Sequence, residues 1–470
     1  MKQREHWGSR LGMIMATAGS AIGLGSLWQF PYVTGVNGGG IFVLLYLLFT
    51  FFIGVPIFIA EVVLGRRAQR SPVGAFSEMS SHSKNWKMVG WMCIITNFII
   101  LSYYSVVSGW ALNYTLMSLT DFSRHISLEQ VGQTFDILVS SGGISLFWHF
   151  IFMLIAVGTV YGGVRKGIEY WARILTPTLF ALLIGLFFYA MTTDGFGDAV
   201  KFIFHPDFSK FKPSSSLQAL GLSFFTLSVG LGVLITYGSY MKKDVDIPKT
   251  AVTVACLDVI VSLMAAMVIF PFVFTYQFAP SEGPGLVFKV LPHLFALSPG
   301  TMVLSTLFFL LVVFTALTSA VSVLEVIVAN FIELFSWSRR KSVLIVGAAV
   351  FIFGIPSALS GSGLLFANWG KIYGFNFLDT LNFLSYTWLL PFNGFCVTLF
   401  VGWFLNKKIR NEEFRQGSSW GWLLYPWLLV IRWLAPVAII LIVLQSAGVI
   451  DVDAIFAKPV EKALVAGSGE

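Results

Sequence analysis

Two stretches of small and hydroxyl residues interrupt otherwise apolar runs of the chain. One is the segment GSAIGLGS at residues 19–26, and the other is TLSVGLG at residues 226–232. Each Gly weakens a helix by about 1 kcal/mol relative to Ala, and hydroxyl side chains compete for backbone hydrogen bonds. Close packing between apolar helices would also favour small residues here. If the helices instead unwind, their free N–H and C=O groups would suit a buried ligand that is bound but not chemically changed.

Residues that carry out covalent catalysis form no group in this sequence. The six histidines and the three cysteines, Cys93, Cys256 and Cys396, show no spacing typical of a nucleophile–base pair, a metal site or a disulfide framework. One carboxylate, Glu61, falls inside an apolar run, where an ionisable residue is a functional candidate by default. We expect Glu61 to brace free N–H groups rather than to move protons. The sequence therefore predicts a binding or transport protein that is not an enzyme and has no organic cofactor.

The composition requires a membrane around these stretches. Apolar residues make up 56% of the chain and charged residues 11%, whereas a soluble surface needs about a quarter of its residues charged. Apolar runs of roughly 18 to 25 residues recur, and each can cross about 30 Å of hydrocarbon as a helix. We therefore expect an all-α membrane protein with about eleven spans. Their expected centres are Leu24, Phe52, Leu101, Met153, Leu182, Leu227, Ser262, Val313, Val350, Leu390 and Ile439.

The net charge of +7 is distributed as in a multi-pass membrane protein rather than a nucleic-acid-binding one. Basic residues cluster at the N-terminus and then in every second loop, which is the positive-inside pattern. The clusters are Arg4 and Arg10; Arg66, Arg67 and Arg70; Arg165, Lys166 and Arg173; Lys242 and Lys243; Arg339, Arg340 and Lys341; and Lys407, Lys408 and Arg410. This pattern places the protein in the cell (inner) membrane with its N-terminus in the cytoplasm and the tail after Ile450 outside.

The two interrupted runs occupy matching positions, one in the first span and one in the sixth. Glycine-interrupted spans at matching positions of two halves indicate a binding site near the bilayer midplane. An odd number of spans per half gives the halves opposite orientations. We expect residues 1–195 to form the first inverted repeat (spans 1–5) and 196–405 the second (spans 6–10). Residues 406–470 would form a cytoplasmic loop, span 11 and a short external tail.

Several motifs at consistent spacing resemble one transporter family. They are Arg4-Glu5-His6-Trp7, Ser20-Ala21-Ile22-Gly23-Leu24-Gly25, Phe30-Pro31, Asn37-Gly38-Gly39-Gly40, Phe224-Phe225-Thr226-Leu227-Ser228, Ile235-Thr236-Tyr237-Gly238-Ser239-Tyr240 and Leu317-Thr318-Ser319. The sequence is similar to the neurotransmitter:sodium symporters, and in particular to their bacterial, LeuT-like amino-acid transporter branch, over spans one to ten. The resemblance implies a 5+5 inverted-repeat fold with unwound first and sixth helices. It also implies sodium-driven symport of amino acids by alternating access.

The resemblance implies two sodium sites. The site between spans one and eight, here called the Ser319 site, maps to Gly19, Ile22, Thr315, Thr318 and Ser319. Neutral oxygens suit a hard monovalent cation, although these hydroxyls would otherwise bond back to helix carbonyls. The other, here called the Asp258 site, maps to Ala21, Ser26, Thr226 and Asp258, together with the substrate carboxylate. The family usually has Asn at positions 26 and 258, so we expect weaker reach from Ser26 and a stronger ligand in Asp258.

The substrate residues implied by the resemblance form a mostly aliphatic pocket. They are Ser20, Ala21, Leu24, Gly25, Ile100, Tyr104, Phe225, Thr226, Ser228, Leu231, Ser319 and Val323. The monoamine branch of the family has an Asp at the position of Gly23, so Gly23 is typical of carriers whose substrate brings its own carboxylate. That carboxylate would meet the N–H groups near Leu24 and Gly25 at a half-helix N-terminus, together with Tyr104. We therefore expect a neutral, hydrophobic amino acid.

Gates and a hinge are also implied by the resemblance. Arg4 and Glu333, surrounded by Trp7, Ser239 and Tyr240, match the cytoplasmic ion-pair gate, although a solvated charge pair would explain them as well. The outer gate departs from the family, because Gln29 and Asn382 stand where Arg and Asp are usual. Gly167 and Pro177 match a glycine–proline hinge in span five, whose unwinding admits water toward the Ser319 site.

Chloride is not expected to be needed. The chloride ligands of dependent relatives map to Tyr46, Leu222, Thr226, Asp258 and Ser262. Leu222 replaces a Gln donor, and Asp258 would supply the negative charge itself, unless burial keeps its carboxyl neutral. Two rival functions stay open, a proton-coupled amino-acid carrier and a transporter-derived amino-acid sensor or channel.

Overall fold

The computed structural model describes residues 5–80, 83–120, 128–278 and 286–456, and these residues form helices and turns without a strand. Nine continuous helical stretches of this part of the chain are long and apolar enough to cross a membrane. They are α3–α4 (Gly40–Ala68), α6 (Lys87–Leu119), α8 (Gly142–Tyr161), α9 with its preceding turn (Val164–Ala190), α13 (Ile247–Thr275), α15 (Thr301–Phe335), α16 (Arg339–Ala358), α18–α19 (Phe377–Phe404) and α21–α22 (Gly421–Ser446).

Two further spans are broken. The first consists of α1 (Arg10–Ala21) and a second helical piece, Gly25–Val36, which ends with α2 (Phe30–Val36) and is bent by 52° relative to α1. The sixth consists of α11 (Pro213–Thr226) and α12 (Val233–Ser239), which are separated by the non-helical residues 227–232. Within the described residues, the nine stretches and the first bent pair give up to ten spans by length and apolar composition. The pair α11 and α12 lies where the sequence predicts the sixth span, so the count of eleven stays a prediction.

Glycine makes the break in the sixth span possible. Gly230 and Gly232 have φ angles of +83° and +71°, and Ser228 has +56°. Only Gly adopts this left-handed region without steric cost, so a Cβ at either glycine would resist the turn. The Gly-rich composition that suggested unwinding therefore has a direct conformational role at these positions.

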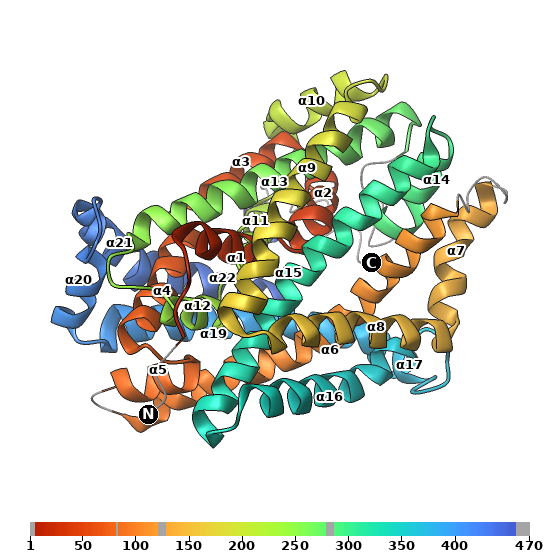
Figure 1. Cartoon of the computed structure of the whole chain (residues 1–470). Helices are drawn as coiled ribbons and strands as arrows, with labels where there is room; N and C mark the ends of the chain where they lie inside the picture. The colour runs from red at the N-terminus through yellow and green to blue at the C-terminus, as the bar shows by residue number, and fades with distance from the viewer. Residues whose placement is uncertain (1–4, 81–82, 121–127, 279–285, 457–470) are drawn as a thin grey trace.

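The two ends of the helical bundle differ in charge. The shorter helices α7 (Leu128–Ser140), α10 (Phe196–Phe204) and α14 (Leu291–Ala296) lie at one end. At the opposite end lie the N-terminal segment with Trp7, α5 (Pro72–Met79) and α20 (Lys407–Arg415), and we call this the N-terminal end (Figure 1). Arg66, Arg165 and Arg339 bond to groups at this end. The basic clusters spaced along the sequence therefore converge in space.

Helix α15 forms the centre of the bundle and positions the site. It packs against α6, α9, α8, α16 and α1, and it is the most deeply buried of the nine helical stretches. The peripheral spans α8, α9 and α21–α22 are less than half buried, which leaves apolar side chains for lipid. Both broken spans pack against this most deeply buried helix, α1 in span one and α12 in span six.

Candidate substrate and sodium site

The two broken spans are fastened to each other at their breaks. The Ser228 hydroxyl donates to the Ser20 carbonyl at 2.9 Å, which joins span six to span one. The fully buried Glu61 accepts the Gly230 N–H at 2.6 Å. An unwound backbone donor inside a membrane protein needs such a partner, because water is absent there. Glu61 thus makes the bracing contact that the sequence predicts for it.

A small cavity lies between the breaks and α6. It has a volume of about 40 Å³, far below the roughly 300 Å³ of a typical ligand pocket, so its walls must move apart to admit an amino acid. All twelve substrate residues expected from the sequence line it, together with Gly23 and Leu101. Leu101 was missed because it follows Ile100 on the helix, and helical spacing does not normally place two consecutive residues on one face.

The cavity holds a weakly satisfied polar group in a mostly apolar wall. The Tyr104 hydroxyl is buried and makes no hydrogen bond of good geometry among the described residues, although the Leu24 N–H and the Ser319 hydroxyl lie near it. Leu24 and Gly25 begin the second half-helix of span one, where backbone N–H groups lack helical partners. A Cβ on Gly25 would come within 2.6 Å of the Phe225 ring. Glycine therefore lets the aromatic ring lie directly against the start of the half-helix.

The Ser319 site is assembled from α15 and the end of α1. The Ser319 hydroxyl lies 3.4 Å from the Gly19 carbonyl oxygen, 3.2 Å from that of Ser20 and 3.3 Å from that of Ile22. It therefore points across to span one rather than back along its own helix. A Cβ on Gly19 would come within 3.1 Å of Thr318, so these two residues are also in close contact.

The other two hydroxyls of the Ser319 site bond within α15. Thr318 donates to the Thr315 carbonyl at 2.9 Å, and Thr315 donates to the Leu311 carbonyl at 2.8 Å. Thr318 and Thr315 thus bond back to carbonyl groups of their own helix, as hydroxyl side chains in helices often do, whereas Ser319 does not. A hydroxyl that donates its proton retains lone pairs, so back-bonding leaves both threonines able to face a cation.

The Asp258 site is a closed network of buried hydroxyls around one carboxylate. Ser26 donates to Asp258 Oδ1 at 2.5 Å, and Tyr46 donates to Oδ2 at 3.1 Å. The Tyr46 and Thr226 hydroxyl oxygens are 2.9 Å apart. Ser26, Tyr46 and Asp258 are all fully buried. The structure thus brings together Ser26, Thr226 and Asp258, and it shows that Ser26 contacts the carboxylate directly.

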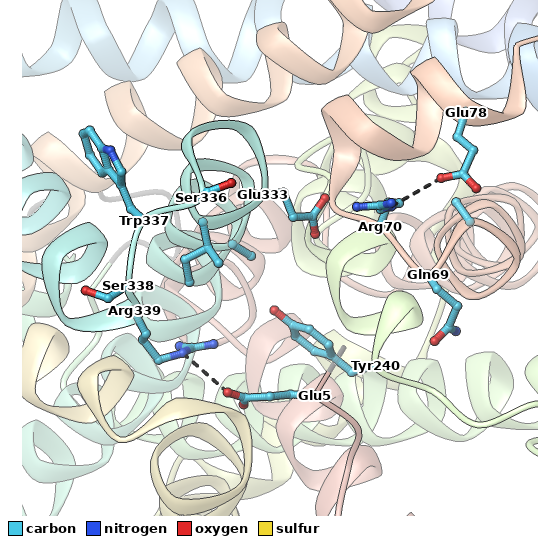
Figure 2. A pocket seen from close by; sticks show the side chains of 13 residues that line it. Glu5, Gln69, Arg70, Glu78, Tyr240, Glu333, Ser336, Trp337, Ser338 and Arg339 are labelled. Atoms are coloured by element: carbon cyan, nitrogen blue, oxygen red, sulfur yellow. Dashed lines mark hydrogen bonds and ion pairs between the residues drawn. The ribbon is translucent and has the colours of Figure 1, made fainter. Parts of the chain in front are cut away.

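A charged cavity of about 670 Å³ opens at the N-terminal end (Figure 2). Figure 2 shows Glu5 with Arg339 on one side, Arg70 with Glu78 on the other, and Glu333 and Tyr240 between them. Glu333, at the end of α15, accepts hydrogen bonds from the N–H and the hydroxyl of Ser71 just before α5. Arg4, its expected partner, lies outside the described residues, so that pairing stays a prediction.

Aromatic and charged residues close the path from this cavity toward the site. Trp7 is buried against Tyr237 and Tyr240, and its indole N–H donates to the Tyr237 carbonyl at 3.1 Å. The Tyr240 hydroxyl donates to the fully buried Glu325 at 2.6 Å, and Arg339 holds both oxygens of Glu325 at 2.7 and 2.8 Å. Glu325 was not among the residues predicted from the sequence, although a carboxylate inside a long apolar run is a signal for a functional residue.

The outer gate shows no direct contact in this conformation. Gln29 is half-buried at the end of the π-helical turn Gly25–Gln29, whereas Asn382 is exposed on α18 (Phe377–Phe383). Among the described residues no hydrogen bond joins the two side chains. At the expected cytoplasmic gate, by contrast, the Ser239 hydroxyl donates to the Thr236 carbonyl within span six. The pairing of Gln29 with Asn382 therefore stays a prediction.

The expected hinge lies where span five approaches the N-terminal segment. Gly167 belongs to a π-helical turn, Val164–Glu169, and a Cβ on it would come within 2.1 Å of the Thr159 carbonyl oxygen. Pro177 lies inside α9 (Tyr170–Ala190), where it removes one helix hydrogen bond. Glycine is thus required for close packing at this position, and proline weakens the helix that follows.

Glu169 connects this hinge to the first span and was not anticipated from the sequence. Its carboxylate accepts hydrogen bonds from the N–H groups of Gly8 at 2.6 Å and Ser9 at 3.0 Å, and it also pairs with Arg173. Gly8 and Ser9 directly precede α1, whose N-terminal N–H groups favour an anion. Glu169 therefore ties the expected hinge segment to the start of span one.

Comparisons with known proteins agree with this arrangement. A profile of the Sodium:neurotransmitter symporter family matches residues 4–135 and 128–455. An uncharacterized sodium-dependent transporter of Bacillus subtilis, YhdH, is 37% identical, with 95% of this chain and 98% of the relative aligned. An uncharacterized sodium-dependent transporter of Methanocaldococcus jannaschii is 32% identical over 90% of this chain and 87% of the relative.

A solved structure shares the fold. The crystal structure of MhsT in complex with L-phenylalanine matches with a TM-score of 0.86 and 41% identity, over 94% of this chain and 100% of MhsT. This likeness confirms the all-α, LeuT-type architecture that the sequence predicts. The profile, the relatives and the fold agree that the chain belongs to the sodium:neurotransmitter symporter family and is a sodium-dependent membrane transporter, not an enzyme.

Proposed function

We propose that the chain is a sodium-driven symporter that imports neutral, hydrophobic amino acids by alternating access. The observation that carries this proposal is the placement of Ser319. Its hydroxyl lies within 3.5 Å of the carbonyl oxygens of Gly19 and Ile22, and the same residue lines the cavity between the breaks. One residue thus belongs both to the expected sodium site and to the substrate pocket, which is how occupancy of one site would favour the other.

The pocket supports an amino acid as the substrate. The weakly satisfied Tyr104 hydroxyl and the half-helix start at Gly25 are suited to a carboxylate, which would supply an acceptor of good geometry. Ile100, Leu231 and Val323 supply the aliphatic wall, and none of the described residues that line the cavity is charged. A ligand with a free carboxylate and an apolar side chain fits this wall. MhsT, a protein of the same fold, was crystallised with L-phenylalanine, which is a neutral amino acid with an apolar side chain.

The Asp258 network supports independence from chloride. Asp258 already provides a buried acceptor whose two oxygens are held by Ser26 and Tyr46. Leu222, which stands where dependent relatives have a donor, is fully buried and apolar. A chloride ion would therefore meet a carboxylate in place of a donor, and the two negative charges would repel. We infer that Asp258 is ionised when sodium is bound and replaces the anion.

The proposed orientation follows from the charge difference between the ends of the bundle. We place the N-terminal end in the cytoplasm of an inner membrane, because the basic clusters converge there. The inverted repeats would span residues 1–195 and 196–405, with residues 406–470 appended. The cavity at the N-terminal end would then be the route of release into the cell.

The rival functions are a proton-coupled carrier and an amino-acid sensor that moves nothing. Uptake of a labelled panel of neutral amino acids into proteoliposomes separates the three. A symporter accumulates the substrate only with an inward sodium gradient, whereas a proton-coupled carrier accumulates it with a proton gradient alone. Specific binding without accumulation under either gradient would identify a sensor and reject the proposal.

A further inference from the structure

At the N-terminal end of the bundle, two arginines share a single carbonyl oxygen, that of Gly402, near the C-terminus of span ten. Arg410 Nη1, from α20, donates to the Gly402 carbonyl at 2.8 Å, and Arg432 Nε, from span eleven, donates to the same oxygen at 2.8 Å. Gly402 makes this possible, because a Cβ there would come within 3.1 Å of the Arg432 side chain. The two guanidinium groups are therefore held next to each other by the fold.

Neither charge is balanced by a carboxylate in the part of the chain that the structure describes. The other bonds of Arg410 go to the Val401 carbonyl and the Asn411 side chain. Burial, followed by the repulsion of Arg432, lowers the pKa of Arg410 to about 10. A helix C-terminus carries only about half a negative charge, so capping the end of span ten cannot offset two full positive charges. The described part of the chain therefore leaves two neighbouring positive charges that an anion from outside the protein could balance.

The surroundings of the pair are those of a membrane interface. The Arg432 guanidinium lies 5.3 Å from the centre of the Trp403 ring, which makes an edge contact with Trp433 at 5.0 Å. Both tryptophans are about half exposed, at 47% and 58%. Exposed Trp rings are typical of the headgroup level of a bilayer. The apolar side chains of Leu429, Leu434 and Val437 are exposed along the same span, where acyl chains would lie.

We propose that Arg432, with the charge of Arg410 directly behind it, binds the phosphate of an anionic phospholipid on the lipid-facing surface of spans ten and eleven. A guanidinium presents several N–H donors in the fixed fork geometry that matches phosphate oxygens. The two terminal nitrogens of the partly exposed Arg432 have no partner in the described part of the chain, whereas Arg410 is buried and contributes its positive charge rather than a direct contact. The exposed Lys407 and Lys408 on α20 add positive charge beside the pair.

Lipid binding to the purified protein tests this proposal. Native mass spectrometry would follow titration with phosphatidylglycerol and, separately, with zwitterionic phosphatidylcholine. Each interfacial arginine contributes about 1 kcal/mol, so replacing both should weaken phosphatidylglycerol binding by about thirty-fold. Arg410→Gln with Arg432→Gln is the test variant. Arg340→Gln is the matched control, because Arg340 lies at the same end but stacks on Tyr161, and its binding should not change.

The remaining arms keep the outcome decisive. If the double variant does not fold, Arg432→Gln alone alters a partly exposed side chain and should weaken phosphatidylglycerol binding by about five-fold. Equal binding of phosphatidylglycerol to the unmodified protein, the Arg432 variant and the control would overturn the proposal. Displacement of phosphatidylglycerol by millimolar inorganic phosphate would also overturn it, because the ligand would then be a free anion rather than a lipid.

Discussion

The two proposed sodium sites both include residues at the break in span one, and they are built from different chemistry. The Ser319 site gathers neutral oxygens, with one hydroxyl within 3.5 Å of three carbonyl groups. The Asp258 site is organised by a carboxylate that hydroxyls hold on both oxygens. In the proposed function, one site would therefore select its ion by geometry, whereas the other would contribute a fixed charge.

Each design has its own weakness. Neutral ligands attract a cation only when several lie at the correct distance, so the Ser319 site depends on the packing of α1 against α15. A buried carboxylate attracts a cation strongly but is costly without one. The donors Ser26 and Tyr46 reduce that cost. We therefore expect substitutions at the Ser319 site to act through coordination and those at the Asp258 site to act through charge.

Replacing Thr318 and Ser319 together by Ala should have the largest effect. Each lost hydroxyl removes about 1.5–3 kcal/mol of interaction with a charged partner, so sodium-stimulated uptake should fall by about a hundredfold or more. Uptake into proteoliposomes at varied sodium concentration measures the change. Ser305→Ala, another buried serine of α15, is the matched control and should keep full uptake. Unchanged sodium dependence in the double variant would remove Ser319 from the ion site.

Replacing Asp258 by Asn should have the next largest effect, because it keeps the shape and removes the charge. One charged interaction of about 1.5–3 kcal/mol corresponds to a loss of about ten-fold or more in sodium affinity. Substituting gluconate for chloride should leave uptake by the unmodified protein unchanged, whereas chloride should partly restore the variant. A strong chloride requirement in the unmodified protein would contradict the assignment of Asp258 as the replacement for the anion.

Pro177→Ala should have a moderate effect that distinguishes the role of the hinge from the roles of the two sodium sites. The change restores one hydrogen bond of α9, so opening of the hinge should cost about 1 kcal/mol more and the maximal uptake rate should fall about five-fold. Sodium affinity should stay the same, because neither site loses a ligand. Initial rates measured against sodium and substrate concentration test this split. A changed sodium affinity with an unchanged maximal rate would oppose a hinge role.

The smallest effect is expected at the outer gate, where both expected partners, Gln29 and Asn382, are neutral. Raising the ionic strength from about 0.1 to 1 M shortens the Debye length from about 10 to 3 Å, yet a neutral Gln29–Asn382 pair should leave uptake nearly constant. Sodium is held fixed and a non-transported salt is varied. The variant with Gln29→Arg and Asn382→Asp carries the charges usual in the family and should gain salt dependence. Strong salt dependence in the unmodified protein would exclude a neutral gate.

The sequence predicts the spans and the pocket because both depend on local patterns. Apolar run length marks each helix, and the motifs around Ser20, Phe225 and Thr318 place the pocket residues at fixed spacing. It does not predict Glu325 with Arg339, or Glu169 with Gly8, since these bonds join residues whose proximity arises only from helix packing. The buried pair of Arg66 and Glu413 likewise joins span two to α20 across 347 residues. No local pattern connects such partners.

The comparison between the two sites is tested most directly by counting ions. Parallel uptake of radioactive sodium and a labelled neutral amino acid into proteoliposomes, under the same gradient, gives the number of sodium ions that enter with each substrate molecule. Because both sites contribute to one transport cycle in this account, we predict two sodium ions per amino acid in the unmodified protein. A ratio of one, or amino-acid uptake without sodium entry, would contradict it.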